Sequence, residues 1–296
     1  MTVASKYEIR RDGDWKLLVL SARWNPDLWR HIREILSSES PARHPQVKRF
    51  RFFQGDREEE LYLKTYYFLD IPERMRSLFR TSKALRAFKQ GEALQQEGFR
   101  APLAVAAGEQ RKHRLLQKAF LLTVAIDATP LAQFLKERFQ SAHVGWCRER
   151  RIYLCQLAAE VARLHERGFV HGDLTPYNIL VRTGSAGAAF FFLDNDRTRR
   201  YPFWLGHWQW KRNLVQLNRF QLPGIRLHDR IRFLRDYLTN RTGSRNDRRL
   251  IVWLEKRTRR RRAWKDRLRG ELSFRELMKW DGRLSKKKRK VESWPA

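Results

Sequence analysis

The feature that most constrains this chain is a pair of polar motifs, each joined to a run of strand-forming residues. The first is VHGDLTPYNILV, residues 170–181, which holds a His, an Asp and an Asn at the spacing H-x-D-x4-N. The second is FFFLDND, residues 190–196, in which a strand-forming run ends in two aspartates. Such motifs form either polar turns between core elements or the floor of an active site, and the rest of the sequence must decide between the two.

The composition predicts a folded and strongly basic protein. The chain of 296 residues is long enough for one large domain or for two lobes, and 42% of it is hydrophobic, including 18 Phe and 11 Trp. The formal net charge of +31 predicts a polyanionic partner. Nucleic acid, an anionic membrane surface and a phosphorylated substrate all fit such a field, and the charge alone does not choose among them.

The cysteines and the apolar segments indicate in which cellular compartment the protein works. Cys147 and Cys155 stand apart from any other Cys or His grouping, so neither a metal site nor a disulfide framework is expected, and a reducing cytoplasm fits best. The N-terminal sequence MTVASKYEIRRDGDWK has no apolar segment typical of a signal peptide. The apolar run at residues 119–126 is far shorter than the ~20 residues that cross a bilayer. We therefore expect a cytoplasmic protein that is soluble or peripheral to a membrane.

Hydrophobic periodicity and turn residues predict alternating β-rich and helical regions. Two strands are expected within residues 47–69, joined by a polar turn at Gly55 and Asp56, with Lys64 in the second strand. Further strands are expected at residues 103–107, 113–126, 179–181 and 190–193. Helices are expected at residues 82–97, 127–139, 151–167 and 211–238.

Five polar residues within this order of elements predict the chemistry of phosphoryl transfer. That reaction needs a Lys for the α- and β-phosphates, a carboxylate for the proton of the acceptor hydroxyl, and hard oxygen ligands for Mg²⁺. Lys64 lies in a strand, His171, Asp173 and Asn178 lie in a loop between a helix and a strand, and Asp194 ends the next strand. A single H-G-D is more often a turn than a catalytic site, and a single Lys in a strand is usually a solvated surface residue. Their conjunction in this order predicts an active site.

The motifs resemble those of the protein-kinase-like superfamily, and within it they are most similar to the lipopolysaccharide kinases of the InaA/WaaP type, which phosphorylate Kdo or heptose in the inner core. HGDLTPYNIL stands in place of the His-Arg-Asp-Leu form, and Asp-Asn-Asp in place of Asp-Phe-Gly. SKALRAF and GFRAP resemble the family's Ser-(Arg/Lys)-Ala and Gly-(Ile/Val)-x-x-Pro stretch, and RIRFLRDYL at residues 230–238 resembles its helical end. The resemblance covers roughly residues 45–240.

The resemblance implies a role for each of the five residues. Lys64 would bind the phosphates of ATP, and Asp173 would be the catalytic base. Asn178 and Asp194 would be ligands of Mg²⁺, and His171 would brace the catalytic loop.

The resemblance also implies further nucleotide contacts. Asp196 would assist the metal or hold Arg197. The backbone around Val124 and Ile126 would bind adenine, and Asp127 would approach the ribose. As sequence alone, that segment is a strand followed by a capped helix.

The chain departs from the family pattern at two places. The segment FFQGDREEE offers a single Gly where a Gly-rich loop would cover the phosphates. The Glu that family members carry on the helix of residues 82–97 falls on Ala87, and Glu92 is the nearest substitute. Either Glu92 reaches Lys64 through a shifted helix, or the Lys–Glu pair is absent and activity is impaired.

These features together predict an α+β, protein-kinase-like fold of two lobes. Residues 1–127 would form a small β-rich N-terminal lobe with the nucleotide-binding Lys, and residues 128–240 a mainly helical catalytic lobe. Residues 241–296 would form a basic extension dotted with tryptophans. Basic and aromatic residues together suit an anionic membrane surface, RNA or plain solubility.

The predicted function is phosphorylation of a Kdo or heptose sugar by ATP and Mg²⁺, at the cytoplasmic face of the inner membrane. An atypical protein kinase or a kinase linked to tRNA modification is the rival enzyme. A pseudokinase or binding module is the rival from another class, and Ala87 and the missing Gly-rich loop favour it. The sequence does not predict the oligomeric state.

Overall fold

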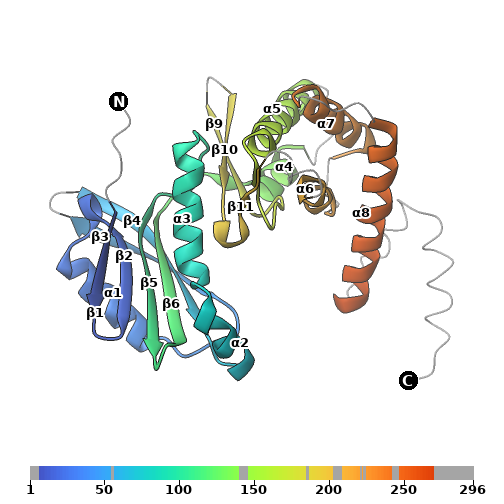
Figure 1. Ribbon diagram of the computed structural model, residues 1–296. Coiled ribbons are helices and arrows are strands. Elements are labelled where there is room, and N and C mark those ends of the chain that lie inside the picture. The colour runs from blue at the N-terminus through green and yellow to red at the C-terminus, as the bar shows by residue number, and fades with distance from the viewer. Residues whose placement is uncertain are drawn as a thin grey trace.

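The structure is a computed structural model that describes residues 7–54, 57–139, 146–184, 187–202, 209–220, 222, 225–241 and 247–269. It has two lobes, an N-terminal lobe built on a six-stranded antiparallel sheet and a mainly helical C-terminal lobe (Figure 1). The N-terminal lobe contains β1 (Tyr7–Asp12), β2 (Trp15–Leu20), η1 (Ser21–Arg23), α1 (Pro26–Ser38), β3 (Gln46–Gln54), β4 (Arg57–Tyr67), α2 (Ile71–Arg76), η2 (Ser77–Phe79), α3 (Lys83–Gln96), β5 (Ala104–Lys112) and β6 (Leu115–Val124). The C-terminal lobe contains β7 (Thr129–Pro130), α4 (Leu131–Phe139), α5 (Trp146–Glu166), β8 (Phe169–Val170), β9 (Ile179–Gly184), β10 (Gly187–Phe192), η3 (Asn195–Arg197), β11 (Arg199–Arg200), α6 (Gln209–Asn218), α7 (Leu227–Thr239) and α8 (Asp247–Arg269).

The N-terminal sheet has the strand order β1-β2-β5-β6-β4-β3, and a helix covers each of its faces. Helix α1 begins at Pro26 behind an Asn25 cap and buries Leu28, Ile32 and Leu36, which are four residues apart and so share one side of the helix. These side chains pack with Leu61 and others of one sheet face. Helix α3 packs against the opposite face.

The alternation of side chains along β4 directs Lys64 toward α3. Leu61 and Leu63 belong to the core beneath α1, whereas Tyr66 belongs to the core beneath α3. Because successive side chains of a strand point to opposite faces, Lys64 lies on the same face as Tyr66. Its ammonium group lies 5.6 Å from the centre of the Tyr66 ring. The pattern of burial in one strand thus sets the direction of the lysine.

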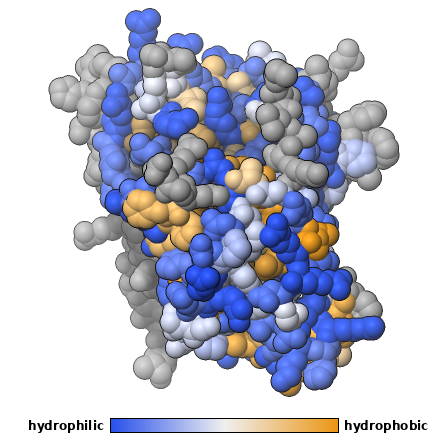
Figure 2. Space-filling view, turned by 90° about the vertical axis from the view of Figure 1, so that its left-hand side faces the viewer, coloured by the Kyte–Doolittle hydropathy of each residue, from blue (hydrophilic) through white to orange (hydrophobic). Residues whose placement is uncertain are grey.

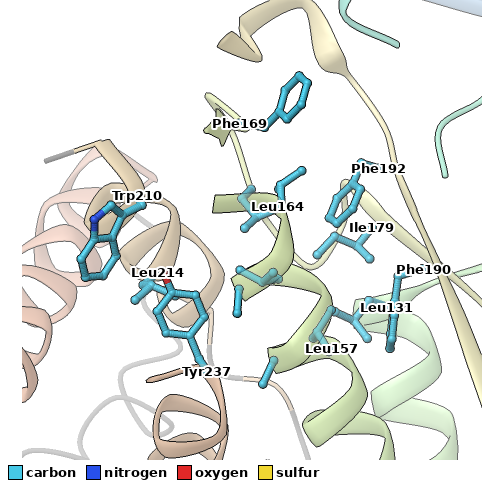
Figure 3. Packing of buried hydrophobic residues seen from close by; sticks show 14 of the residues in the cluster. Leu131, Leu157, Leu164, Phe169, Ile179, Phe190, Phe192, Trp210, Leu214 and Tyr237 are labelled. Atoms are coloured by element: carbon cyan, nitrogen blue, oxygen red, sulfur yellow. The ribbon is translucent and has the colours of Figure 1, made fainter. Parts of the chain in front are cut away.

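Helix α5 runs through the centre of the C-terminal core. In Figure 3, Leu157 and Leu164 of α5 lie between Leu214 and Tyr237 of the outer helices on one side and Ile179 of the β-hairpin on the other. The hairpin consists of β9 and β10, which pair antiparallel, with β7 added at the edge of β9. The two polar motifs lie at the end of this hairpin, so the same core that holds α5 also holds the loop before β9 and the turn after β10.

Helix α8 belongs in part to the C-terminal lobe. Leu250, Leu254, Thr258 and Arg262 are buried at intervals of four residues, and the two leucines join the core around α5. The hydrophobic core therefore continues beyond residue 241, where the composition becomes basic. None of the described helices, α8 included, is long and apolar enough to cross a membrane.

The predicted elements are largely present. The hairpin of residues 47–69 forms β3 and β4, although its expected turn at Gly55 and Asp56 lies outside the described residues. The single helical region expected at 211–238 is two helices, α6 and α7. Residues 7–38, for which no element was predicted, form β1, β2 and α1. Figure 2 shows the side of the molecule on which the N-terminal lobe lies, where the hydrophobic surface is broken into separate patches.

Candidate active site

Lys64 and Asp194 make a contact between the two lobes. The Lys64 Nζ atom lies 2.5 Å from Asp194 Oδ1, and the two residues are 130 positions apart in the sequence. Both side chains retain contact with solvent, with 22% of Lys64 and 47% of Asp194 exposed. Two charged residues from separate lobes therefore face each other at an accessible position, where an anionic ligand and a cation can separate them.

The loop before β9 orients Asp173 through its own hydrogen bonds. The backbone amide of Thr175 donates to the Asp173 carbonyl (2.9 Å), and that of Asn178 donates to the Thr175 carbonyl (2.9 Å). The Asn178 side-chain nitrogen donates to the Asp173 carbonyl (2.8 Å) and to Asp173 Oδ2 (3.3 Å). Because this amide nitrogen bonds to Asp173, the oxygen of the same amide points away from it. The Asp173 side chain is 38% exposed, so its carboxylate is accessible from solvent.

His171 links the catalytic loop to the strand end that carries Asp194. Its Nε2 atom donates to the Leu193 carbonyl at 2.7 Å, and the Leu193 amide donates in turn to the Asn178 carbonyl at 2.9 Å. Burial lowers the pKa of His171, whose bond to Leu193 and whose neighbours Asp173 and Asp194 act in the opposite direction. His171 thus connects the two motifs through the Leu193 backbone.

Gly172 allows the second motif to approach the first. A Cβ atom at this position would lie 2.3 Å from the Arg197 Cβ and 2.6 Å from the Arg197 carbonyl oxygen. Neither distance is possible without a shift of the backbone of η3, which directly follows Asp194. The H-G-D form of the motif therefore has a steric reason in this chain.

Asp194 and Asp196 occupy different environments at the end of β10. Asp194 adopts a left-handed backbone conformation (φ 55°, ψ 52°) that turns the chain from β10 into η3, a conformation that Asp tolerates better than most residues. Burial raises the pKa of Asp196, and Asp194 adds to this rise, against the lowering effects of Arg197, Lys64 and Arg86. Asp196 thus belongs to the same electrostatic cluster as the lobe-bridging pair.

Helix α3 contacts the second motif without a glutamate. Ala87 is buried on α3, and its neighbour Arg86 donates from Nε to the Asp196 carbonyl at 3.2 Å. Glu92 accepts a hydrogen bond from Gln96 of the next turn (3.1 Å), and burial raises its pKa. The partner of Lys64 in this structure is Asp194, and α3 is held to the motif by an arginine.

The segment expected to bind adenine follows β6. The Val124 amide donates to the Leu103 carbonyl (2.9 Å), and the Ala125 amide donates to the Glu60 carbonyl (2.8 Å), so both are engaged within the sheet. Ile126 is partly buried and Asp127 is exposed in the extended stretch before β7.

Helix α6 holds the catalytic loop through residues that the motif analysis missed. Asn213 Oδ1 accepts from the His171 amide (2.9 Å), and its Nδ2 donates to Gln216 Oε1 (2.9 Å). Gln216 donates to the Gly172 carbonyl (2.7 Å) and accepts from the Leu174 amide (3.1 Å). Asn213 and Gln216 lie on one face of α6, and their spacing among apolar residues was the available signal.

Arg219 directly follows α6 and contacts the same loop as Asn213 and Gln216. Its Nη2 atom lies 3.7 Å from Asp173 Oδ1, and its guanidinium lies 4.6 Å from the centre of the Phe220 ring. Phe220 packs edge-on against Tyr177 of the catalytic loop, with the ring centres 5.1 Å apart. A cation therefore lies beside the Asp173 carboxylate, and Phe220 joins that cation to the ring of Tyr177.

The oxygen atoms of the site fit Mg²⁺ only together with a bound nucleotide. The part of the chain that the structure describes contains no group of three His, Cys, Asp or Glu side chains able to hold a metal ion. The residues at hand are the carboxylates of Asp194 and Asp196 and the amide oxygen of Asn178. Mg²⁺ is commonly bound by one or two carboxylates plus substrate phosphates and water, which matches this limited set of hard ligands.

The fold and the site define a phosphotransferase of the protein-kinase-like class. The sequence matches the model of the lipopolysaccharide kinase (Kdo/WaaP) family over residues 37–237. The chain is also similar to the solved structure of WaaP in complex with acyl carrier protein, with a TM-score of 0.56 and 19% identity, covering 79% of this chain and 95% of that chain. At that identity the likeness shows the fold. No curated protein matches the sequence. The chain belongs to the lipopolysaccharide kinase family.

Proposed function

We propose that this kinase transfers the γ-phosphoryl group of ATP, with Mg²⁺, to a Kdo or heptose hydroxyl of the lipopolysaccharide inner core. The observation that supports the proposal is the meeting of Lys64 and Asp194 across the lobes, beside a loop that presents Asp173 to solvent. Positioning and electrostatic stabilisation account for most of the catalysis in such reactions. The site offers both, because its charged groups are fixed by a strand, a hairpin and α6.

Each residue then has a defined task. Lys64 leaves Asp194 to bind the phosphates of ATP, and Asp194 and Asn178 hold the cation. Bound Mg²⁺ supplies the positive charge that offsets the charge of the phosphate oxygens. Asp173 accepts the proton of the acceptor hydroxyl as that oxygen forms its bond to phosphorus and the bond to ADP breaks. His171 keeps the two motifs at a fixed separation.

A binding module without turnover is the second candidate, because a specific observation favours it. Ala87 is buried where family members carry the helical Glu, and Lys64 pairs with Asp194. In this alternative, the chain would bind nucleotide or acceptor and transfer nothing. Against this alternative, Arg86 of α3 donates to the Asp196 carbonyl, so α3 is still attached to the site, by an arginine in place of the Glu.

We further propose that the kinase works as a peripheral protein on the cytoplasmic face of the inner membrane, where its acceptor is made. The exposed side of α8 supports this proposal, since Lys256, Arg257, Arg260 and Arg261 lie there beside the exposed Ile251 and Val252. Basic residues near an anionic surface each contribute about 1 kcal/mol to binding.

The decisive experiment compares phosphate transfer by the wild type and by Asp173→Asn, using ATP and an acceptor that carries Kdo or heptose. We expect Asp173→Asn to lose about 10²–10⁴-fold in rate, because a general base is removed, while nucleotide affinity stays nearly unchanged. The matched control is Asp27→Asn, which removes an exposed carboxylate of α1. A variant at Asp173 that keeps more than about a tenth of the wild-type rate contradicts the assignment. Autophosphorylation without any sugar would favour the protein kinase alternative.

A further inference from the structure

The Asp173 carboxylate has a different neighbour at each of its oxygens. Asn178, which lies next to the strand that carries Asp194, donates to Oδ2 at 3.3 Å. Arg219 lies 3.7 Å from Oδ1. The first neighbour belongs to the side of the site assigned to the nucleotide. The second therefore marks the other side, where the acceptor hydroxyl must approach the base.

The backbone around Arg219 is held in place by two further arginines. Arg262 of α8 donates from Nε to the Arg219 carbonyl (2.9 Å) and from Nη2 to the Asn218 carbonyl (2.6 Å). Arg230 of α7 donates to the Phe220 carbonyl at 3.3 Å and to Asn218 Oδ1 at 2.9 Å. Arg262 is buried, and burying a guanidinium is costly unless it is hydrogen-bonded, so these bonds give a well-defined position to the segment that follows α6.

An aromatic surface adjoins this cation. The Arg219 guanidinium lies over Phe220, which packs edge-on against Tyr177. Tyr177 lies in the catalytic loop between Asp173 and Asn178, and 56% of it is exposed. A large exposed aromatic ring in the same loop as Asp173 provides an apolar face with a polar tip, the combination that suits the CH-rich face of a sugar ring.

We propose that Arg219 binds a carboxylate of the sugar acceptor, and that Tyr177 covers one face of the sugar ring. The proposal rests on the proposed function and adds to it the residues that select the acceptor. A hydroxyl bound to Asp173 lies about 2.6–3.2 Å from the carboxylate, so an anionic substituent on the same ring comes within reach of the guanidinium. Arginine matches carboxylate and phosphate groups through two parallel hydrogen bonds.

The test uses Arg219→Gln, with Arg235→Gln as the matched control, because Arg235 on α7 also lies 3.7 Å from a carboxylate, that of Asp236. The probes are a Kdo–heptose saccharide and the same saccharide with its Kdo carboxyl converted to the methyl ester. Both KM and kcat are measured for saccharide and for ATP, and saccharide binding is measured directly by calorimetry. Thermal unfolding of each variant shows that it is folded, and Arg219→Lys provides a variant that keeps the charge without the paired hydrogen bonds.

We expect Arg219→Gln to raise the acceptor KM and Kd about 10- to 100-fold, because a charge-assisted pair is lost, with the KM for ATP unchanged. For the wild type, replacing the acid by its methyl ester should raise the acceptor KM and Kd by a similar factor. For Arg219→Gln, the same replacement should raise them little further. Tyr177→Phe should bind the saccharide as the wild type does, and Tyr177→Ala should bind it more weakly.

Three results would overturn the proposal. In the first, Arg219→Gln lowers kcat alone, which would assign Arg219 to the transferring phosphoryl group of ATP. In the second, the variant behaves like Arg235→Gln. In the third, the calorimetric titration shows equal binding of the acid and the ester by the wild type. Failure of the proposed function would give a different result. A wild type that binds the saccharide through Arg219 but transfers no phosphate would contradict the kinase activity and leave the anion site intact.

Discussion

Lys64 and Arg219 are two cations that face two aspartates of one site, and the structure positions them by different means. Lys64 lies in the middle of a strand, its direction set by alternation within a sheet whose two faces are both covered by helices. Arg219 lies after the end of a helix, and its backbone is held by side chains from α7 and α8. The first contact joins two lobes and the second lies within one lobe.

This difference predicts which of the two contacts can separate when a ligand binds. A contact between lobes is made by groups that can move apart together with their lobes, so the Lys64–Asp194 pair suits a place where a nucleotide must enter. Arg219 and Asp173 are held by one continuous core through α6, so their separation is set before any ligand binds. We therefore expect the nucleotide side to adapt and the acceptor side to be preorganised.

Among the changes that test this comparison of Lys64 with Arg219, the largest effect is expected on the nucleotide side. Lys64→Met removes the cation that binds the phosphates, and we expect kcat/KM to fall by about 10²–10³-fold, the usual loss for a group that stabilises charge in the transition state. The paired variant Glu92→Gln should reduce activity only modestly, because Glu92 bonds to Gln96. Steady-state kinetics with ATP and the sugar acceptor measure both. Equal losses would show that Glu92 moves to Lys64 in the active state.

A smaller effect is expected from the outer face of α8, which tests whether the acceptor side is also the membrane side. Changing Lys256, Arg257, Arg260 and Arg261 to Gln should weaken binding to anionic vesicles about 10- to 100-fold at physiological salt, because each cation contributes about 1 kcal/mol near the surface and salt screens part of that sum. The buried stripe of α8 is untouched, so nucleotide binding should persist.

The control for α8 is a competition at equal charge and about 150 mM salt, since salt screens binding to lipid and to RNA alike. Vesicles that contain anionic lipid should hold the wild type in the presence of structured RNA. Retention by RNA alone would remove the membrane proposal and leave the kinase assignment standing.

The positions of the motif residues were predictable from the sequence because each lies in a strand or in a short segment that borders one. Lys64 stands in an alternating strand, His171, Asp173 and Asn178 lie in the loop before β9, and Asp194 follows β10. The two-lobed α+β fold was predicted and is confirmed. The roles of the individual site residues remain predictions.

The rest of the site depends on tertiary contacts, for which the local sequence gives a weak signal or none. Arg219 is one of many arginines in a chain of net charge +31, and nothing in its neighbours marks it as the one beside Asp173. Asn213 and Gln216 bond to backbone groups of a loop about 40 positions away. Helix α1 was not predicted, although its apolar positions recur every four residues.

The smallest expected effect is a dependence of stability on pH that arises beneath the catalytic loop. His165 is buried between Tyr237 (2.8 Å from Nδ1) and Asn213 (3.1 Å from Nε2), the residue that also binds the His171 amide. Burial lowers the pKa of His165 to about 3, and Arg241 nearby lowers it further, while the bond to Asn213 acts against both. The folded state therefore keeps His165 neutral, with Tyr237 and Asn213 as its two hydrogen-bond partners.

The unfolded state binds a proton at His165 below about pH 6.5, whereas the folded state does not until about pH 3. Unfolding therefore takes up protons between these values, and the free energy of unfolding should fall as the pH falls through this window, by about 2 kcal/mol at pH 5 from this residue. Urea unfolding at pH 7 and pH 5 measures the loss. His165→Gln should show a smaller loss between the two pH values, and His31→Gln, an exposed position of α1, should match the wild type. An unchanged pH dependence in His165→Gln would contradict the prediction and leave His171, whose pKa is also lowered by burial, as the source.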